Sequence, residues 1–263
     1  MPFLLIDKPK DWTSHDVIGY LRGVLKIKKI GHAGTLDPFA TGLLIVGVER
    51  DATKRLDEFK NLPKKYIATI KLGAVSDTQD STGNITNLPQ PLLVKEGGTI
   101  SPPTKGELEG VLDSFIGPQE QIPPMYSAKK IKGKKLYELA RQGIEIERKP
   151  NKIEIHDIKL LAYSYPQLKI EVACGTGTYI RTLAYDIGEA LRTGAYCDEL
   201  RRISVGDYSV TDAIEPKKIT KDNFPTTSDS LYRLHPDVKS GQAVGRVPSE
   251  QRDVNYILEK ADI

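Results

Sequence analysis

The chain has 263 residues, of which 39% are hydrophobic and 28% charged, and its formal net charge is +3 at pH 7. These values exclude a disordered chain and a miniature scaffold, and the length suits one large domain with an appendage, or two domains. The two cysteines lack CxxC spacing and the four histidines lack the spacing of paired metal ligands, so we expect no structural zinc and a reducing cytosol.

The first fifty residues predict a strand, a helix and a second strand. The apolar run 3–6 is far too short for a signal peptide or a membrane span, and it predicts a short buried strand. Apolar residues then recur at helical intervals over 17–25 behind Ser14, which we expect to be the N-cap of an amphipathic helix. The β-branched run 43–48 predicts another buried strand.

The middle of the chain changes from apolar alternation to strong positive charge. Residues 64–73 alternate as in a strand and run into the polar turn SDTQDSTGN, whereas 85–105 is rich in proline and predicts an exposed connector. Residues 106–117 predict a helix. Between 122 and 152 there are nine Lys or Arg against three Glu, and the usual explanation of such a run is a solvated face.

Residues 168–194 predict a strand, a glycine loop and an amphipathic helix. The segment ELRRISVGDYSV, 199–210, predicts a loop that leads into a further strand. Beyond residue 211 no periodicity is sustained, so we place a domain boundary there. The expected division is therefore a main domain over 1–210 and a short appendage over 211–263.

Two ligand-binding motifs are approached but not met. CGTGTYI resembles a dinucleotide fingerprint, but Ile180 stands where a third glycine must allow close packing of helix and strand. The turn that begins at Asp77 resembles a calcium loop, but its twelfth position is Leu88 instead of the bidentate glutamate. We therefore interpret this segment as an ordinary Asx-type turn or a polar surface loop.

The loop GHAGTLDPFATG, residues 31–42, gathers one carboxylate with one histidine and three glycines. Taken alone, Asp37 before Pro38 is a common way to begin a turn, and the glycines permit sharp changes of direction. A turn aspartate does not need a histidine, three glycines and a threonine within a dozen residues, whereas a loop that approaches a ligand does. Asp37 is therefore a candidate for chemistry.

This loop and the strand after it, GHAGTLDPFATGLLIVGV, resemble the catalytic motif GH.G.LDP.A.G.L of TruB-type tRNA pseudouridine-55 synthases. Further blocks resemble the same family in the same order, and together they span residues 4 to about 210. These blocks are IDKPKDWTSHDV, KKYIATIKLG with SDTQDSTG, IPPMYSAKKIKGKKLYELARQG, CGTGTYIRTLAYDIGEAL and ELRRISVGDY.

The resemblance implies the mixed α/β (α+β) pseudouridine synthase fold, in which helices flank a central and mostly antiparallel sheet. It also implies a basic RNA-clasping insertion over about 118–152. The implied activity converts uridine 55 in the T arm of tRNA to pseudouridine by base flipping, glycosidic bond cleavage, rotation of the uracil and its rejoining to the sugar through carbon 5. The protein would be a cytoplasmic monomer that binds tRNA and needs no membrane, protein partner, metal or organic cofactor.

The resemblance also assigns the site. Asp37 becomes the essential carboxylate, which is ionised at neutral pH and can act as a nucleophile or as a base. Arg181 becomes its partner, which would hold the carboxylate and keep its pKa low. Tyr66 would stack on the target base. His32 would fill the space left by the flipped nucleotide, and Tyr179 and Leu200 would also contact the substrate.

The implied RNA contacts are basic side chains that could neutralise phosphates. They are Lys8, Lys129, Lys130, Lys132, Lys134, Lys135 and Arg201. Two departures from the family pattern stand beside them. GVERDATK carries one residue more than the usual spacing, which leaves Lys54 without an assigned phosphate, and 211–263 is shorter than the PUA-type domain of many bacterial members.

Three other interpretations stay open at this level. The chain could be the subunit of a guide-RNA-dependent synthase, although such subunits normally carry a well-developed PUA domain. It could be a non-catalytic RNA-binding protein or tRNA-folding chaperone that keeps the clasp. It could also be a nucleotide-dependent enzyme built on CGTGTYI. Whether the first chemical step is nucleophilic attack or elimination is left open as well.

Overall fold

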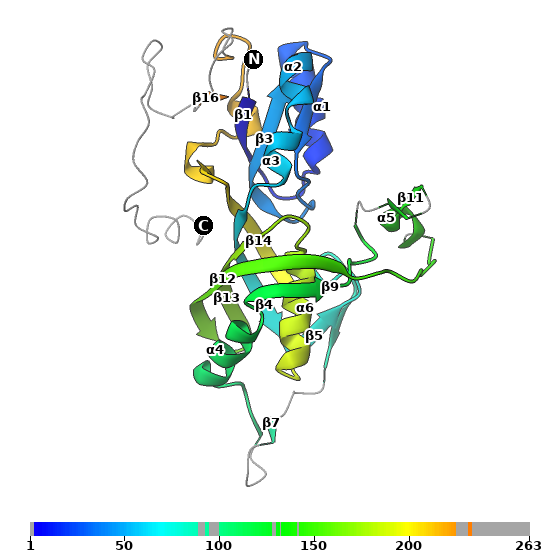
Figure 1. The fold of residues 1–263 in the computed structure, drawn as a ribbon, viewed down its shortest axis with the longest axis vertical. Helices are drawn as coiled ribbons and strands as arrows, with labels where there is room; N and C mark the ends of the chain where they lie inside the picture. Colours follow the sequence, from blue (N-terminus) through cyan, green and yellow to red (C-terminus); the bar gives the residue numbers. More distant parts are fainter. Residues whose placement is uncertain are drawn as a thin grey trace.

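The computed structural model describes residues 3–88, 93–94, 100–127, 130–131, 133–140, 142–224 and 231–232. Within these residues the chain forms a large sheet, three small two-stranded sheets and helices on both sides of the large sheet (Figure 1). The strands of the large sheet are β1 (Phe3–Lys8), β2 (Ile30–Ala33), β3 (Thr41–Val48), β4 (Lys64–Leu72), β9 (Gly117–Gln121), β12 (Asn151–Ser164), β13 (Gln167–Cys174), β14 (Ala195–Val205), β15 (Tyr208–Ser209) and β16 (Leu231–Tyr232).

The strand order is β16-β1-β3-β14-β4-β13-β12-β9, with β2 paired to β3 and β15 paired to β14. Two of these pairs, β1 with β16 and β3 with β14, are parallel, and the remaining pairs are antiparallel. The expected mixed α/β fold with a central, mostly antiparallel sheet is therefore confirmed.

The helices are α1 (Ser14–Leu25), α2 (Glu49–Lys54), α3 (Asp57–Lys60), α4 (Lys105–Ser114), α5 (Leu136–Ala140) and α6 (Ile180–Ala190), with the 3-10 turns η1 (Val210–Asp212) and η2 (Pro216–Lys218). The small sheets pair β5 (Ala74–Ser76) with β6 (Ile85–Asn87), β7 (Leu93–Val94) with β8 (Ile100–Ser101), and β10 (Lys130–Ile131) with β11 (Lys134–Lys135). No helix in the described part of the chain is long and apolar enough to cross a membrane.

Three apolar clusters hold the helices to the sheet. The first joins α4 and α6 to β4, β12, β13 and β14, and it includes Leu36 and Phe39 from the loop that carries Asp37. The second lies under α2 and α3 against β1, β3 and the end of β14. The third packs α1 against β1 and β3. The loop with Asp37 is thus built into the largest cluster through its apolar neighbours.

The two halves of the sheet meet where β3 runs parallel to β14, and this seam comprises the pairs Arg201 with Thr41 and Arg202 with Gly42. Gly42 has φ +102°, and a Cβ atom there would lie 2.3 Å from the carbonyl oxygen of Arg202. Only glycine fits this combination of backbone angle and close approach. The last glycine of the GHAGTLDPFATG loop is therefore required by strand pairing at the seam.

Three expectations from the sequence need correction. The N-cap of α1 is Thr13, because its side chain and that of Asp16 form a reciprocal capping box, whereas Ser14 is buried. The segment ELRRIS is not a loop but part of β14, where it pairs with β4 along its length. The basic insertion is shorter than expected, because 117–121 forms β9 in the main sheet and β12 begins at Asn151.

Part of the expected appendage packs on the sheet. The amide of Ile214 donates to the carbonyl of Leu5 over 2.9 Å, the amide of Asp7 donates to the carbonyl of Ile214, and Ile219 is buried against α1 and β1. Residues 225–230 and 233–263 lie outside the described part of the chain, as do 89–92 and 95–99 of the expected connector.

Candidate active site

The backbone before Asp37 is fastened to helix α1. The hydroxyl of Ser14 accepts a hydrogen bond from the amide of Leu36 over 2.9 Å and donates one to the carbonyl of Leu36 over 3.1 Å. Both groups are buried, so this pair is shielded from competing water. The residue that looked like a helix cap in the sequence therefore positions the residue next to the candidate carboxylate.

The backbone after Asp37 is fastened by Lys8. The Lys8 side chain is fully buried and burial lowers its pKa to about 8. Its ammonium donates to the carbonyl of Pro38 over 3.2 Å, and it also donates to the carbonyls of Pro9 and Trp12. This placement contradicts the expected RNA contact, because the ammonium is committed to holding the loop and does not face solvent.

Asp37 itself lies beside Arg181. Oδ2 of Asp37 is 2.9 Å from Nε of Arg181, and the side chains are 34% and 3% exposed, respectively. The guanidinium of Arg181 also donates to the carbonyls of Thr78 and Tyr126, over 2.9 and 2.8 Å. The arginine predicted to pair with Asp37 is therefore brought to it, and it is fixed by groups on two other segments.

A second carboxylate, which the sequence did not single out, holds the same arginine. Nη1 of Arg181 lies 3.0 Å from Oδ2 of Asp80, whose side chain is buried. The other oxygen of Asp80 accepts from the Thr78 hydroxyl and from the amide and hydroxyl of Thr82. The turn is of the expected Asx type, but its second aspartate points inward. Threonines two residues before and after Asp80 were the available signal, since their hydroxyls can satisfy a buried carboxylate.

The pKa of Asp37 is raised above its usual value, not lowered as expected from its arginine partner. Burial is the main cause, and the nearby Asp80 carboxylate raises the pKa further. The charge of Arg181 opposes these two effects without reversing them, since part of it is already neutralised by Asp80. Asp37 is therefore a carboxylate of increased basicity whose side chain is one-third accessible.

Two predicted substrate contacts lie in the apolar cluster around this loop. Tyr66, on β4, is 8% exposed, and Leu200, on β14, is 7% exposed; both belong to the cluster that contains Leu36. Burial raises the pKa of the Tyr66 phenol, so the phenol is neutral at physiological pH. Tyr66 and Leu200 thus form an apolar lining on the strands next to the loop.

Arg202 is a further residue that the sequence analysis missed. It is 1% exposed, and its guanidinium donates to the carbonyl of Leu43 over 2.7 Å and to that of Gly34 over 3.1 Å. It thereby closes the loop by joining the residues on either side of Asp37. Arg201, predicted to bind RNA, pairs instead with Asp7 at 2.7 Å, although its side chain is 34% exposed.

Tyr179 lies at the start of α6, two residues before Arg181, and its backbone is clamped by Gln121. The amide of Tyr179 donates to Oε1 of Gln121 over 2.8 Å, and Nε2 of Gln121 donates back to the Tyr179 carbonyl over 3.0 Å. Gln121 is buried at the end of β9, where the basic insertion departs from the sheet. This clamp ties the base of the insertion to the helix that carries Arg181.

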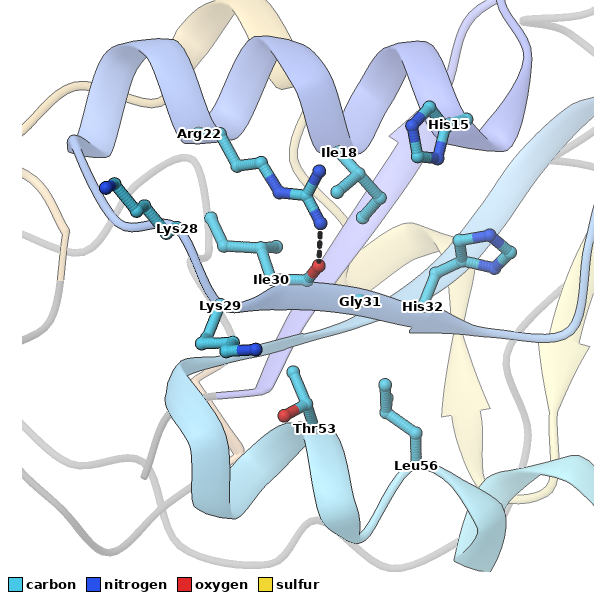
Figure 2. Close-up of a pocket in the computed structure, with 10 residues that line it drawn as sticks. All are labelled: His15, Ile18, Arg22, Lys28, Lys29, Ile30, Gly31, His32, Thr53 and Leu56. Carbon is cyan, nitrogen blue, oxygen red and sulfur yellow. Dashed lines mark hydrogen bonds between the residues drawn. The ribbon is translucent and has the colours of Figure 1, made fainter.

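His32 lies on β2 at the edge of a cavity of about 470 Å³, which we call the basic pocket. Figure 2 shows α1 on one side of β2 and α2 on the other, with the imidazole of His32 facing the same gap as that of His15. Burial, and then the charge of Arg202, lower the pKa of His32 to about 4. The pocket is lined by His15, Ile18, Arg22, Lys28, Lys29, Ile30, Gly31, His32, Thr53 and Leu56.

The predicted clasp residues lie on the basic insertion. The basic insertion projects away from the main sheet and carries β10, β11 and α5 (Figure 1). Lys130 lies on β10 and Lys134 and Lys135 lie on β11, which pair as a hairpin. Lys129 and Lys132 lie outside the described residues. The lysine-rich segment is therefore partly carried on a hairpin away from the sheet.

Known proteins resemble this chain in sequence and in fold. Residues 22–180 match the family "TruB family pseudouridylate synthase (N terminal domain)", and residues 181–232 match "tRNA pseudouridylate synthase B C-terminal domain". A protein of Protochlamydia amoebophila named "tRNA pseudouridine synthase B" is 45% identical over 82% of this chain and 78% of its own length. One of the same name from Chlamydia muridarum is 41% identical over 84% of this chain and 87% of its own.

Among solved structures, the chain resembles one in a "Cbf5-Nop10-Gar1 Complex", with a TM-score of 0.60 and 26% identity over 81% of this chain. The match spans about half of that longer chain, 51% of its length. The family match covers more than half of the present chain and includes the loop with Asp37. The chain therefore belongs to the TruB family of pseudouridylate synthases.

Proposed function

We propose that this protein converts a uridine of tRNA to pseudouridine, and that the uridine is position 55 in the T arm. The observation that carries the proposal is the Asp37 carboxylate, which is one-third exposed and held 2.9 Å from the buried Arg181. Relatives that are 41–45% identical over most of their length are named "tRNA pseudouridine synthase B", which supports the substrate class. Four residues of the chain account for the proposed chemistry: Asp37, Arg181, Tyr66 and Leu200.

In the proposed reaction the uridine leaves the RNA stack and enters the site beside Asp37. The ionised carboxylate attacks the nucleoside or removes a proton from its sugar, and its raised pKa increases its basicity for either role. Arg181 keeps the carboxylate in place while the uracil detaches, turns and rejoins through carbon 5. Tyr66 offers an aromatic face to the base, and Leu200 helps to exclude water from it.

The remaining site residues are proposed to bind the RNA around the flipped nucleotide. His32 is uncharged at neutral pH, because its pKa is about 4, so it contacts the RNA as a planar ring that can stack on bases. Tyr179 contacts the substrate next to Arg181. The lysines at 129, 130, 132, 134 and 135 neutralise phosphates of the T-arm stem-loop, which the basic insertion grips.

We further propose that residues 1–210 form the catalytic domain and 211–263 a short appendage, and that the protein acts in the cytoplasm as a monomer. Two other functions remain testable. A guide-RNA-dependent synthase subunit is favoured only by the resemblance to the Cbf5-containing complex, at 26% identity. A non-catalytic tRNA chaperone would use the same RNA-binding residues but would not need the Asp37 carboxylate.

The direct test uses a tRNA transcript whose uridines carry tritium at carbon 5, since that hydrogen is released when the base rejoins through carbon 5. We expect the protein alone, without guide RNA, to release tritium from position 55, and a transcript with cytidine at 55 to release none. Asp37→Asn should abolish release while RNA affinity stays within several-fold. Asp51→Asn, on exposed α2, is the matched control and should behave as wild type. Equal release from Asp37→Asn would reject the proposal.

A further inference from the structure

The basic pocket collects arginine, lysine and histidine side chains from three segments of the chain. His15 and Arg22 come from α1, Lys28 and Lys29 from the loop after α1, and His32 from β2. None of the described residues that line the pocket is an aspartate or a glutamate. None of the ion pairs within the described part of the chain includes Arg22, Lys28 or Lys29. The positive charge of the pocket is therefore not neutralised by the protein around it.

Two polar atoms of the pocket are buried and make no hydrogen bond with the described residues. They are Nε of Arg22 and Nδ1 of His32. Another atom of the Arg22 guanidinium, Nη2, donates to the carbonyl of Ile30 over 2.9 Å, which directs the side chain from α1 toward β2 (Figure 2). Unpaired buried polar groups cost free energy, so they indicate a missing partner. An anion with several acceptor oxygens would satisfy this requirement and the charge together.

The pocket is connected to the site of chemistry by one short stretch of backbone. His32 precedes Asp37 by five residues, and five residues of extended chain span at most about 18 Å. An RNA strand that delivers a uridine to Asp37 therefore passes within reach of the pocket.

We propose that the basic pocket binds a backbone phosphate of the substrate RNA, on the strand that flanks the uridine held at Asp37. Arg22 contacts the phosphate with its planar guanidinium, and the exposed Lys28 and Lys29 add point charges at the rim. This inference rests on the proposed function, since it takes RNA to be the substrate. It adds a phosphate subsite beside His32, apart from the basic insertion.

The first experiment measures the affinity for a T-arm hairpin as a function of salt, with Asp37→Asn in every protein so that no turnover occurs. Arg22→Gln, and separately Lys28→Gln with Lys29→Gln, should weaken binding and reduce the slope of log K against log salt by about one. Lys26→Gln removes a charge from the same loop outside the pocket and should leave the slope unchanged. An unchanged slope in both pocket variants would overturn the inference.

The second experiment identifies the phosphate. Each phosphate of the hairpin is replaced in turn by an uncharged methylphosphonate, and binding is measured with and without Arg22→Gln. We expect one position at which the replacement weakens binding several-fold in the parent protein and has no effect in the variant. If no position depends on Arg22, the inference is wrong. Stabilisation of the protein by inorganic phosphate without any such position would indicate a small-anion site and would also overturn it.

These outcomes are separate from those that test the proposed function. Thermal unfolding of Arg22→Gln shows whether that variant folds, and the exposed Lys28 and Lys29 provide variants that do not disturb packing. Absence of tritium release from the wild-type protein would reject the pseudouridine synthase activity, whereas the methylphosphonate scan would still report whether the pocket holds an RNA phosphate.

Discussion

Asp80 and Arg181 form an ion pair in which Oδ2 of the carboxylate lies 3.0 Å from Nη1 of the guanidinium, and the two side chains are 5% and 3% exposed. The same guanidinium lies 2.9 Å from Asp37, so two carboxylates share one buried cation. The more Asp80 neutralises Arg181, the less Arg181 can lower the pKa of Asp37. Asp80 thus adds to the effect of burial in raising the basicity of the candidate carboxylate Asp37.

Replacing Asp80 with asparagine should therefore change the pH profile as well as the rate. The Asp80 charge raises the pKa of Asp37, so its removal lowers that pKa and moves the acid limb of the activity profile to lower pH. The loosened Arg181 should also reduce single-turnover activity, on the order of 100-fold. Tritium release measured between pH 4 and 8 checks both effects.

Asp77→Asn is the matched control for this variant. The Asp77 carboxylate lies in the same turn but accepts hydrogen bonds from the amide and side chain of Asn84. We expect its acid limb to stay where the wild-type limb is. If Asp80→Asn left the limb in place, or moved it to higher pH, the electrostatic link between Asp80 and Asp37 would be wrong.

The raised pKa of Asp37 also predicts how stability depends on pH. Between the ordinary aspartate pKa and the raised one, the folded protein holds a proton that the unfolded chain has released, so stability falls as pH rises through that window. Asp37→Asn has no ionisable group at this position, so its stability does not fall in this pH window for that reason. Its melting temperature relative to wild type should therefore be higher at pH 7.5 than at pH 4. Calorimetry that shows the opposite order would contradict the raised pKa.

Asp37 and Asp80 show most clearly which features of the site can be predicted from the sequence and which cannot. The elements with strong periodicity, such as β4 and α6, and the loop 31–42 were predicted because their signals are local. Asp80 and Arg202 were missed because their partners lie 101 and 159 residues away, and no local pattern indicates such pairings. The roles of Asp80 and Arg202 are therefore visible only in the folded chain, which brings these distant partners together.

Local signals can also compete with tertiary structure. Thr13 and Ser14 both suit an N-cap, and the choice is decided by Asp16, which completes a capping box with Thr13. The Ser14 hydroxyl is then not needed as a cap and accepts a hydrogen bond from the amide of Leu36. The strand at ELRRIS was predicted to be a loop because charged residues interrupt its apolar ones, Leu200 and Ile203, which pack in two different clusters.

Glycine at position 42 should be indispensable to the fold. In Gly42→Ala the new methyl group would lie 2.3 Å from the Arg202 carbonyl, at a φ that side chains rarely adopt, so we expect a loss of more than about 3 kcal/mol in the free energy of unfolding. Gly23→Ala in α1 meets no atom within 4 Å and should stabilise the protein by about 0.5–1 kcal/mol. Urea titration distinguishes the two, and equal stabilities would contradict this account of the seam.

Lys8 should act on catalysis through the loop and not through RNA binding. In Lys8→Met the carbonyls of Pro38 and Trp12 lose their donor inside the protein, so we expect destabilisation of about 2–5 kcal/mol and lower activity with little change in RNA affinity. Lys10→Met, an exposed lysine two residues away, should change neither. A large loss of RNA affinity in folded Lys8→Met, with an unaltered rate at saturating RNA, would restore the original prediction.

The seam between β3 and β14 has a consequence for protein synthesis. Arg202 meets Leu43 across 159 residues, so a nascent chain exposes the Asp37 loop long before the ribosome has made the strand that closes it. The carboxylate lacks the arginine beside it until α6 emerges, and its loop lacks the strand that braces it until β14 emerges. Enzymatic competence therefore arrives late in translation.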